Sequence, residues 1–155
     1  MSNHQNSAIA LVIGLAVVIV TSLFVSPAIA ITQDLQLESA TGYRIKTTFG
    51  YDDPKTEIVR EKGTGTTKVL NCLKVSFYDP SGEMIASYDN IVDGVATGNY
   101  FEFNFDPATQ QLVGEIDLGG ESAGEMYLKG EGDRGWSLIQ VEESGEEKVI
   151  DRVIR

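Results

Sequence analysis

The chain shows two different patterns of apolar and polar residues, which meet near residue 31. An apolar run from Ala8 to Ile31 contains no charged residue, and every charged residue of the protein follows it. After residue 40 apolar and polar positions alternate with a period of two, which is typical of half-buried β-strands. The run Phe101, Phe103 and Phe105 shows this alternation most clearly. No window after residue 32 has the period of an amphipathic helix.

Turn residues divide the alternating part into segments of similar length. Asp-Pro pairs at residues 53–54, 79–80 and 106–107 suit type I turns, because proline presets φ at the second corner and Asp accepts a hydrogen bond from the backbone ahead. Glycine-rich breaks fall between and after these pairs. One strand with its turn averages about 13 residues, the rhythm of an antiparallel all-β domain. The predicted strands are 41–51, 56–62, 67–78, 83–92, 99–105, 110–118, 124–130, 136–142 and 146–154.

These strands predict an all-β fold built as an antiparallel up-and-down meander of about eight or nine strands. Sequential strands leave two open edges unless the sheet closes, and short turns favour pairing between sequence neighbours. We therefore predict a closed or nearly closed barrel, with a two-sheet β-sandwich as the alternative. In strand number the barrel is similar to lipocalin-like barrels, which bind small apolar molecules. Those barrels mark their first strand with Gly-x-Trp, whereas Gly135 and Trp136 are adjacent here and lie near the other end, so no family is inferred.

The apolar run predicts an N-terminal hydrophobic helix that enters a membrane during synthesis. Twelve of the eighteen residues of Ala8–Val25 are Ile, Leu, Val or Phe, which together favour insertion by roughly 4 to 7 kcal/mol. A helix of this length rises about 27 Å, close to the hydrocarbon thickness. Pro27 followed by Ala28-x-Ala30 favours cleavage by a signal peptidase. The length of the run, and the lack of Lys or Arg in Met1–Ser7, favour retention as an anchor.

Residues 1–30 are therefore predicted to be a signal peptide or a transmembrane anchor. Residues 31–40 are predicted to be a tether or a short lead-in strand, and residues 41–155 a single antiparallel β domain. Nothing positive follows the run before Arg44, so both outcomes predict export to a periplasmic, lumenal or extracellular space. The domain would be soluble after cleavage near Ala30, or held on the membrane by Ala8–Val25.

The charge balance limits the kinds of partner. The chain has 12 Lys and Arg against 23 Asp and Glu, for a net charge of −11. Residues 115–147 hold ten of the acids and two of the bases. This excess speaks against nucleic acid and against peripheral adhesion to anionic lipid, which both require basic residues. It fits either a basic protein partner or an acidic surface that keeps the domain soluble.

The distribution of histidine and cysteine excludes several chemistries. The one histidine, His4, precedes the apolar run, so the exported domain has no imidazole for a Ser-His-Asp or Cys-His site. The usual zinc and haem ligation is excluded for the same reason. Cys72 is the one cysteine, so no internal disulfide forms. No calcium loop of the Asp-x-Asp-x-Asp-Gly type is present, and we predict no metal and no cofactor.

Five aromatic residues are the candidate ligand-lining set: Tyr43, Phe101, Phe103, Phe105 and Trp136. They would line the mouth of a barrel that holds a small apolar ligand, or form a packed core.

We predict a non-enzymatic, exported or membrane-tethered β-barrel domain that binds a small apolar ligand or a protein partner. One alternative is a structural or assembly subunit of a membrane complex, held by helix 8–25. A second alternative is a small enzyme with a histidine-independent site at the barrel mouth, where Arg44, Glu102, Arg134 or a tyrosine would transfer protons.

Overall fold

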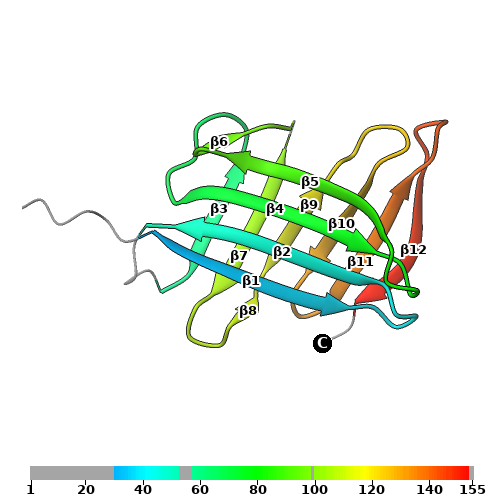
Figure 1. Ribbon diagram of the computed structural model, residues 1–155, viewed down its shortest axis with the longest axis horizontal. Coiled ribbons are helices and arrows are strands. Elements are labelled where there is room, and N and C mark those ends of the chain that lie inside the picture. Colours follow the sequence, from blue (N-terminus) through cyan, green and yellow to red (C-terminus); the bar gives the residue numbers. More distant parts are fainter. Residues whose placement is uncertain (1–29, 53–56, 99, 154–155) are drawn as a thin grey trace, which may run out of the picture.

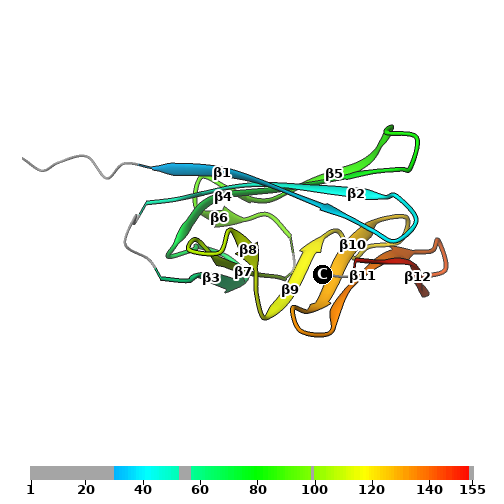
Figure 2. The ribbon, with the colours of Figure 1, turned by 90° about the horizontal axis from the view of Figure 1, so that it is seen from below.

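The computed structural model describes residues 30–52, 57–98 and 100–153, and these residues form two antiparallel β-sheets that face each other (Figures 1 and 2). The prediction of an all-β antiparallel fold is confirmed. The predicted N-terminal helix Ala8–Val25 and the cleavage residue Ala28 lie outside the described residues, while Ala30 is exposed. Within the described ranges no helix is long and apolar enough to cross a membrane. Export remains a prediction.

The first sheet has five strands and the second has six in its main path. The order of the first sheet is β1-β2-β4-β5-β6, and that of the second is β12-β11-β10-β9-β7-β3, with the short β8 paired to β7. The strands are β1 Ile31–Glu38, β2 Arg44–Tyr51, β3 Val59–Gly63, β4 Leu70–Tyr78, β5 Met84–Val92, β6 Val95–Ala96, β7 Phe101–Asp106, β8 Gln111–Leu112, β9 Glu115–Gly119, β10 Met126–Glu131, β11 Gly135–Val141 and β12 Glu147–Val153.

The sheets do not close into a barrel, so that prediction is wrong, and the two facing sheets match the sandwich alternative. The meander breaks at β3, because β2 pairs with β4 while β3 pairs with β7 in the other sheet. The composition of β3 explains its position. Val59 is its one buried residue and Arg60, Glu61 and Lys62 follow, whereas the central strands β2 and β4 bury several apolar residues each. A short charged strand suits a sheet edge.

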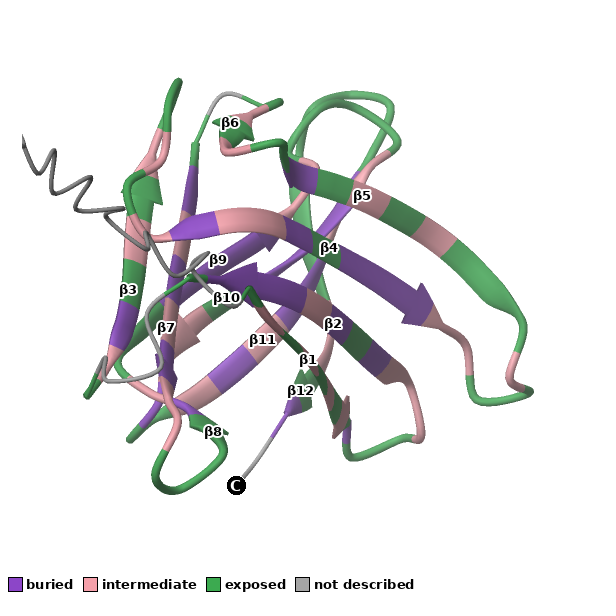
Figure 3. Ribbon diagram, turned by 60° about the vertical axis from the view of Figure 1, so that its left-hand side comes forward, coloured by how far each residue is buried: buried purple, intermediate pink, exposed green. Residues whose placement is uncertain are grey.

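The core lies between the sheets and is filled by aromatic rings. Phe49 of β2 contacts Phe103 and Phe105 of β7, with ring centroids 4.7 and 4.8 Å apart. All three side chains are fully buried. Figure 3 shows the buried residues concentrated on central strands such as β2, β4 and β10, while β1 and most of β5 are half-buried or exposed. Aromatic packing across the interior therefore joins the two layers.

Residues 31–38, predicted as part of a tether or lead-in strand, form a complete edge strand. β1 pairs with β2 without interruption from Ile31 opposite Tyr51 to Glu38 opposite Arg44. At its end the chain contacts the last strand of the other sheet. The N–H of Ala40 donates to the carbonyl of Arg152 (3.0 Å), and both the N–H and the hydroxyl of Thr41 donate to the Asp151 carboxylate (2.9 and 2.6 Å).

A second junction closes the opposite corner of the sandwich. The loop between β3 and β4 runs beside β6, and the N–H of Ala96 donates to the carbonyl of Gly65 (2.8 Å). Thr66 and Val95 form an isolated antiparallel bridge between the same segments. The sheets are thus linked at corners by a few hydrogen bonds rather than by a continuous ladder.

Two of the predicted Asp-Pro turns have the expected capping. Asp79 Oδ1 accepts hydrogen bonds from the Ser81 hydroxyl (2.6 Å) and the Glu83 N–H (2.9 Å). Asp106 Oδ1 accepts one from the Ala108 N–H (2.8 Å). These bonds lower the pKa of both carboxyl groups. The third pair, at residues 53–54, lies outside the described ranges.

The Asp151 contact predicts a specific acid sensitivity. Hydrogen bonds from Ser39 and Thr41 hold the pKa of Asp151 well below its ordinary value. A lowered folded-state pKa stabilises the fold above the unfolded value of about 4, and this contribution is lost as the pH falls below it. Asp151→Asn should therefore cost about 1 kcal/mol at pH 7, a value discounted for solvent screening. Urea unfolding at pH 7 and pH 3 measures the difference.

The Asp151→Asn variant should also lose less unfolding free energy than the parent protein when the pH falls from 7 to 3. Asp133→Asn, in an exposed turn, is the control and should keep the parent's pH dependence. An Asp151→Asn variant with the parent's acid sensitivity would contradict the assignment.

Candidate functional site

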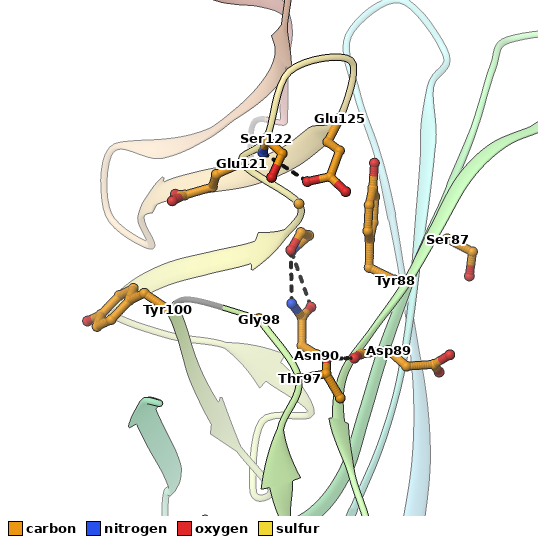
Figure 4. A pocket seen from close by; sticks show the side chains of 12 residues that line it. Ser87, Tyr88, Asp89, Asn90, Thr97, Gly98, Tyr100, Glu121, Ser122 and Glu125 are labelled. Carbon is orange, nitrogen blue, oxygen red and sulfur yellow. Dashed lines mark hydrogen bonds between the residues drawn. The ribbon is translucent and has the colours of Figure 1, made fainter. Parts of the chain in front are cut away.

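A polar cleft lies where the edge of the first sheet meets the β9–β10 turn of the second (Figure 4). We call it the seam cleft. Its volume is about 390 Å³, and its lining consists of residues 87–90 of β5, residues 97, 98 and 100 after β6, and residues 119–122 and 125 around the β9–β10 turn. Two neighbouring segments and a third that follows about twenty residues later therefore form one concave surface.

Asn90 forms the floor of the seam cleft through a bulge in β5. Leu73 is paired with Ile91 and Lys74 with Asp89, so Asn90 is the extra residue of a β-bulge. Its side-chain amide turns toward the second sheet, where Nδ2 donates to the Gly119 carbonyl (2.9 Å) and Oδ1 accepts from the Gly119 N–H (3.2 Å). Asn90 is only 5% exposed. The Asn90 amide thus makes the two hydrogen bonds with Gly119 that the backbone of a neighbouring strand would otherwise make at the end of β9.

Tyr88 makes the second contact across the seam. Its hydroxyl accepts a hydrogen bond from the N–H of Met126 (3.0 Å), and its ring packs edge-on against Phe77 (6.1 Å between centroids). Burial raises the pKa of this hydroxyl, which keeps it neutral. A Cβ on Gly120 would lie 2.6 Å from the Tyr88 ring, so glycine permits the close approach. The floor of the cleft is therefore built from fixed groups.

The rim of the seam cleft carries three carboxylates. Asp89 lies 3.2 Å from Lys74, Glu125 accepts a hydrogen bond from the Ser122 N–H (2.8 Å), and Glu121 lies 3.8 Å from Lys129. Partial burial, and then the nearby Asp117, raise the pKa of Glu121. Residues 87, 97, 100 and 122 carry hydroxyl groups and also belong to the lining, and no lining residue is Lys, Arg or His. Such a surface can accept hydrogen bonds and attract a cation.

The five predicted ligand-lining residues lie elsewhere. Phe101, Phe103, Phe105 and Trp136 are at most 3% exposed and belong to the core between the sheets, and Tyr43 is half-buried against the same core. The structure thus brings these residues together in the interior, and none of them lines the seam cleft. Their role in ligand binding remains a prediction.

The predicted proton-transfer candidates occupy three separate places. Arg44 lies on β2, in a surface depression that it shares with Tyr78 and Gly82. Glu102 lies on β7 in the other sheet, 3.8 Å from Lys62, and Arg134 pairs with Glu131 (3.2 Å) in the β10–β11 turn.

Sequence reasoning missed Asn90, although one signal was present. The segment 88–92 places an amide between apolar and aromatic residues of a strand, where a core-facing position is expected. A buried amide needs hydrogen-bond partners, and the adjacent glycines at residues 119 and 120 offer accessible backbone groups. Only the three-dimensional pairing shows that these two features meet.

Among the described ranges no group of three or more His, Cys, Asp or Glu residues could hold a metal ion. The carboxylates of the seam cleft are therefore assigned no metal. These carboxylates can form ion pairs and hydrogen bonds with an external group.

The Asn90 contact predicts a large and local loss of stability. Asn90→Ala leaves both backbone groups of Gly119 without their partner, which should lower the free energy of unfolding by about 2–3 kcal/mol. Asn104→Ala is the matched control, because this more exposed amide makes one hydrogen bond, to the Glu115 carbonyl (2.7 Å). The control should cost less than about 1 kcal/mol. Equal losses for the two variants in urea unfolding would contradict the role of Asn90.

Comparison with protein-family models, with curated proteins and with solved structures finds no match to this chain. Functional inference therefore rests on the fold, the seam cleft and the charge distribution.

Proposed function

We propose that the chain is an exported or membrane-tethered domain that works by binding a protein partner, and that the seam cleft receives a basic side chain of that partner. The observation that carries this proposal is the composition of the cleft. Asp89, Glu121 and Glu125 line it, and none of its lining residues is basic. The lining of the cleft is thus acidic on a preformed floor, and the lysines that pair with Asp89 and Glu121 lie outside the lining.

The packed interior favours a protein partner over a small apolar ligand. The rings of Phe49, Phe103 and Phe105 contact one another across the space in which an apolar ligand of a barrel would lie. A ligand there would have to displace fully buried side chains, and well-packed cores resist such insertion. The seam cleft needs no such rearrangement.

The charge of the domain supports a basic partner. The net charge of −11 is concentrated in residues 115–147, which include the β9–β10 turn of the cleft. A field of one sign accelerates encounter with an oppositely charged partner, and salt screens it. The apolar run Ala8–Val25 supports a location at or beyond a membrane, where such a partner would be met.

Titration with a basic peptide tests the proposal. The probe is an arginine- and lysine-rich decapeptide, with an acidic decapeptide of equal length as its control, added to the full chain in detergent. Backbone chemical shifts should change at residues 87–90, 97–100 and 119–125 with the basic probe alone. Binding should weaken with added salt, because exposed charges are screened within about 10 Å at 0.1 M ionic strength.

Two neutral substitutions sharpen the test. Glu121→Gln and Asp89→Asn should each weaken binding roughly two- to fivefold, the size of an exposed ion pair. Asp133→Asn removes the same charge outside the cleft and should leave the affinity unchanged. Shift changes that cluster elsewhere, or equal effects of all three variants, would refute the seam cleft as the site.

A further inference from the structure

The two sheets together present four edges, and each edge is a potential site for another strand. The edges are β1 and the β5–β6 side of the first sheet, and β12 and β3 of the second. An unpaired edge exposes a row of backbone N–H and C=O groups that can pair with another chain. Proteins block such edges with bulges, short strands, charged residues or covering segments.

Three of the four edges carry these protective features. β5 has two register shifts, at Phe77/Tyr78 and Leu73/Lys74, and β6 covers its end. The pairing of β12 with β11 shifts at Leu138/Ile139, and β12 carries four charged residues among seven. β3 is five residues long with three successive charged residues.

The β1 edge has no bulge and no described covering strand, and its charged residues are two separated acids, Asp34 and Glu38. Its eight residues pair with β2 in one unbroken register, and no other described strand pairs with it. The strand ITQDLQLE contains no Pro, Gly, Lys or Arg. Ile31, Leu35 and Leu37 face the core but are only half-buried. In Figure 1, β1 forms the lower margin of the first sheet. Among the described edge strands, an uninterrupted strand of this length is the best template for strand addition.

We propose that β1 pairs antiparallel with β1 of a second copy of this chain, about a twofold axis at Leu35. The two acids of the strand and the length of the pairing together select this register, because centring the pair on Gln33 or Leu37 joins fewer residues of the strand. Centring the pair on Leu35 places Leu35 opposite itself, Asp34 opposite Gln36 and Thr32 opposite Glu38. Centring it on Asp34 opposes that acid to itself, and centring it on Gln36 opposes Asp34 to Glu38. Like charges directly opposite destabilise a sheet, so the Leu35 register is favoured.

Dimerisation through β1 is a property additional to the proposed binding of a partner, and it does not obstruct the seam cleft. The interface is isologous, so the same strand serves both copies. The seam cleft lies at β5, on the opposite side of the first sheet, so both clefts stay open. The dimer would therefore present two binding sites to a partner with repeated basic segments.

Gln36 provides a test in which association and fold stability change in opposite directions. Within the chain Gln36 is paired with Lys46 of β2 and shares a surface depression with Arg44. Gln36→Asp should stabilise the fold through these cations but weaken dimerisation, because it faces Asp34 of the second copy. Gln36→Lys should do the reverse. Two symmetry-related pairs change in each variant, so the dimer dissociation constant should shift roughly fivefold each way.

The readouts are sedimentation equilibrium of the full chain in density-matched detergent and urea unfolding of the same samples. The expected result is a dimer whose affinity follows the order Gln36→Lys, parent, Gln36→Asp. A monomer at all concentrations would overturn the proposal. So would a dimer indifferent to the charge at residue 36, which would point to association through the apolar run.

Disulfide trapping tests the register itself, in a Cys72→Ser background that removes the native thiol. Leu35→Cys places two thiols opposite each other at the axis and should give a covalent dimer on mild oxidation. Thr32→Cys is the matched control, because its two copies would lie six residues apart, about 20 Å, which is too far for a disulfide. Equal trapping of both variants, or trapping of Thr32→Cys alone, would overturn the Leu35 register.

Discussion

The side-chain amide of Asn90 joins the two sheets at a place where no backbone ladder does. Its bidentate contact with Gly119, at 2.9 and 3.2 Å, ends β9 against β5 and sets the floor of the seam cleft. A second contact of this kind joins the Tyr88 hydroxyl of β5 to the backbone N–H of Met126 in β10, the next strand of the second sheet. Apart from backbone hydrogen bonds at two corners, the sandwich is thus open along its sides and joined there by side chains. One open side presents the polar cleft at β5, and the other presents the unpaired edge at β1.

The charged residues of β3 are the reason for this open architecture. A nine-strand meander could close if each strand paired with its sequence neighbours, but Arg60, Glu61 and Lys62 disfavour a central position between β2 and β4. With β3 at the edge of the second sheet, β2 and β4 become neighbours and the chain crosses between layers. Phe49, Phe103 and Phe105 then meet across the layers, so the interior is occupied and recognition is left to the surface.

Most strands could be predicted from the sequence, whereas their partners could not. The alternation at Phe101–Phe105 assigns residues to one face of a strand, and the Asp79 and Asp106 turns mark where strands end. Both features can be predicted because they depend only on residues close together in the sequence. Pairing is a non-local property, and a period of two does not say which strand lies alongside. The bulge that turns Asn90 toward Gly119 depends on the register of β5 against β4, so the sequence could not predict the seam cleft. The sequence predicts only a tether or a short lead-in strand over residues 31–40, because the alternation of β1 is weak, with glutamine at one inward position.

Native-state hydrogen exchange at the backbone amides of Gly119 and Met126 tests the side-chain junction most directly. Both amides donate to β5 side chains rather than to a neighbouring strand, at Asn90 Oδ1 and the Tyr88 hydroxyl. If these contacts hold the sheets together, both amides should exchange as slowly as those of the central strands β2 and β4, through global unfolding. Exchange as fast as that of the exposed β11–β12 turn would contradict a fixed junction, and with it a preformed seam cleft.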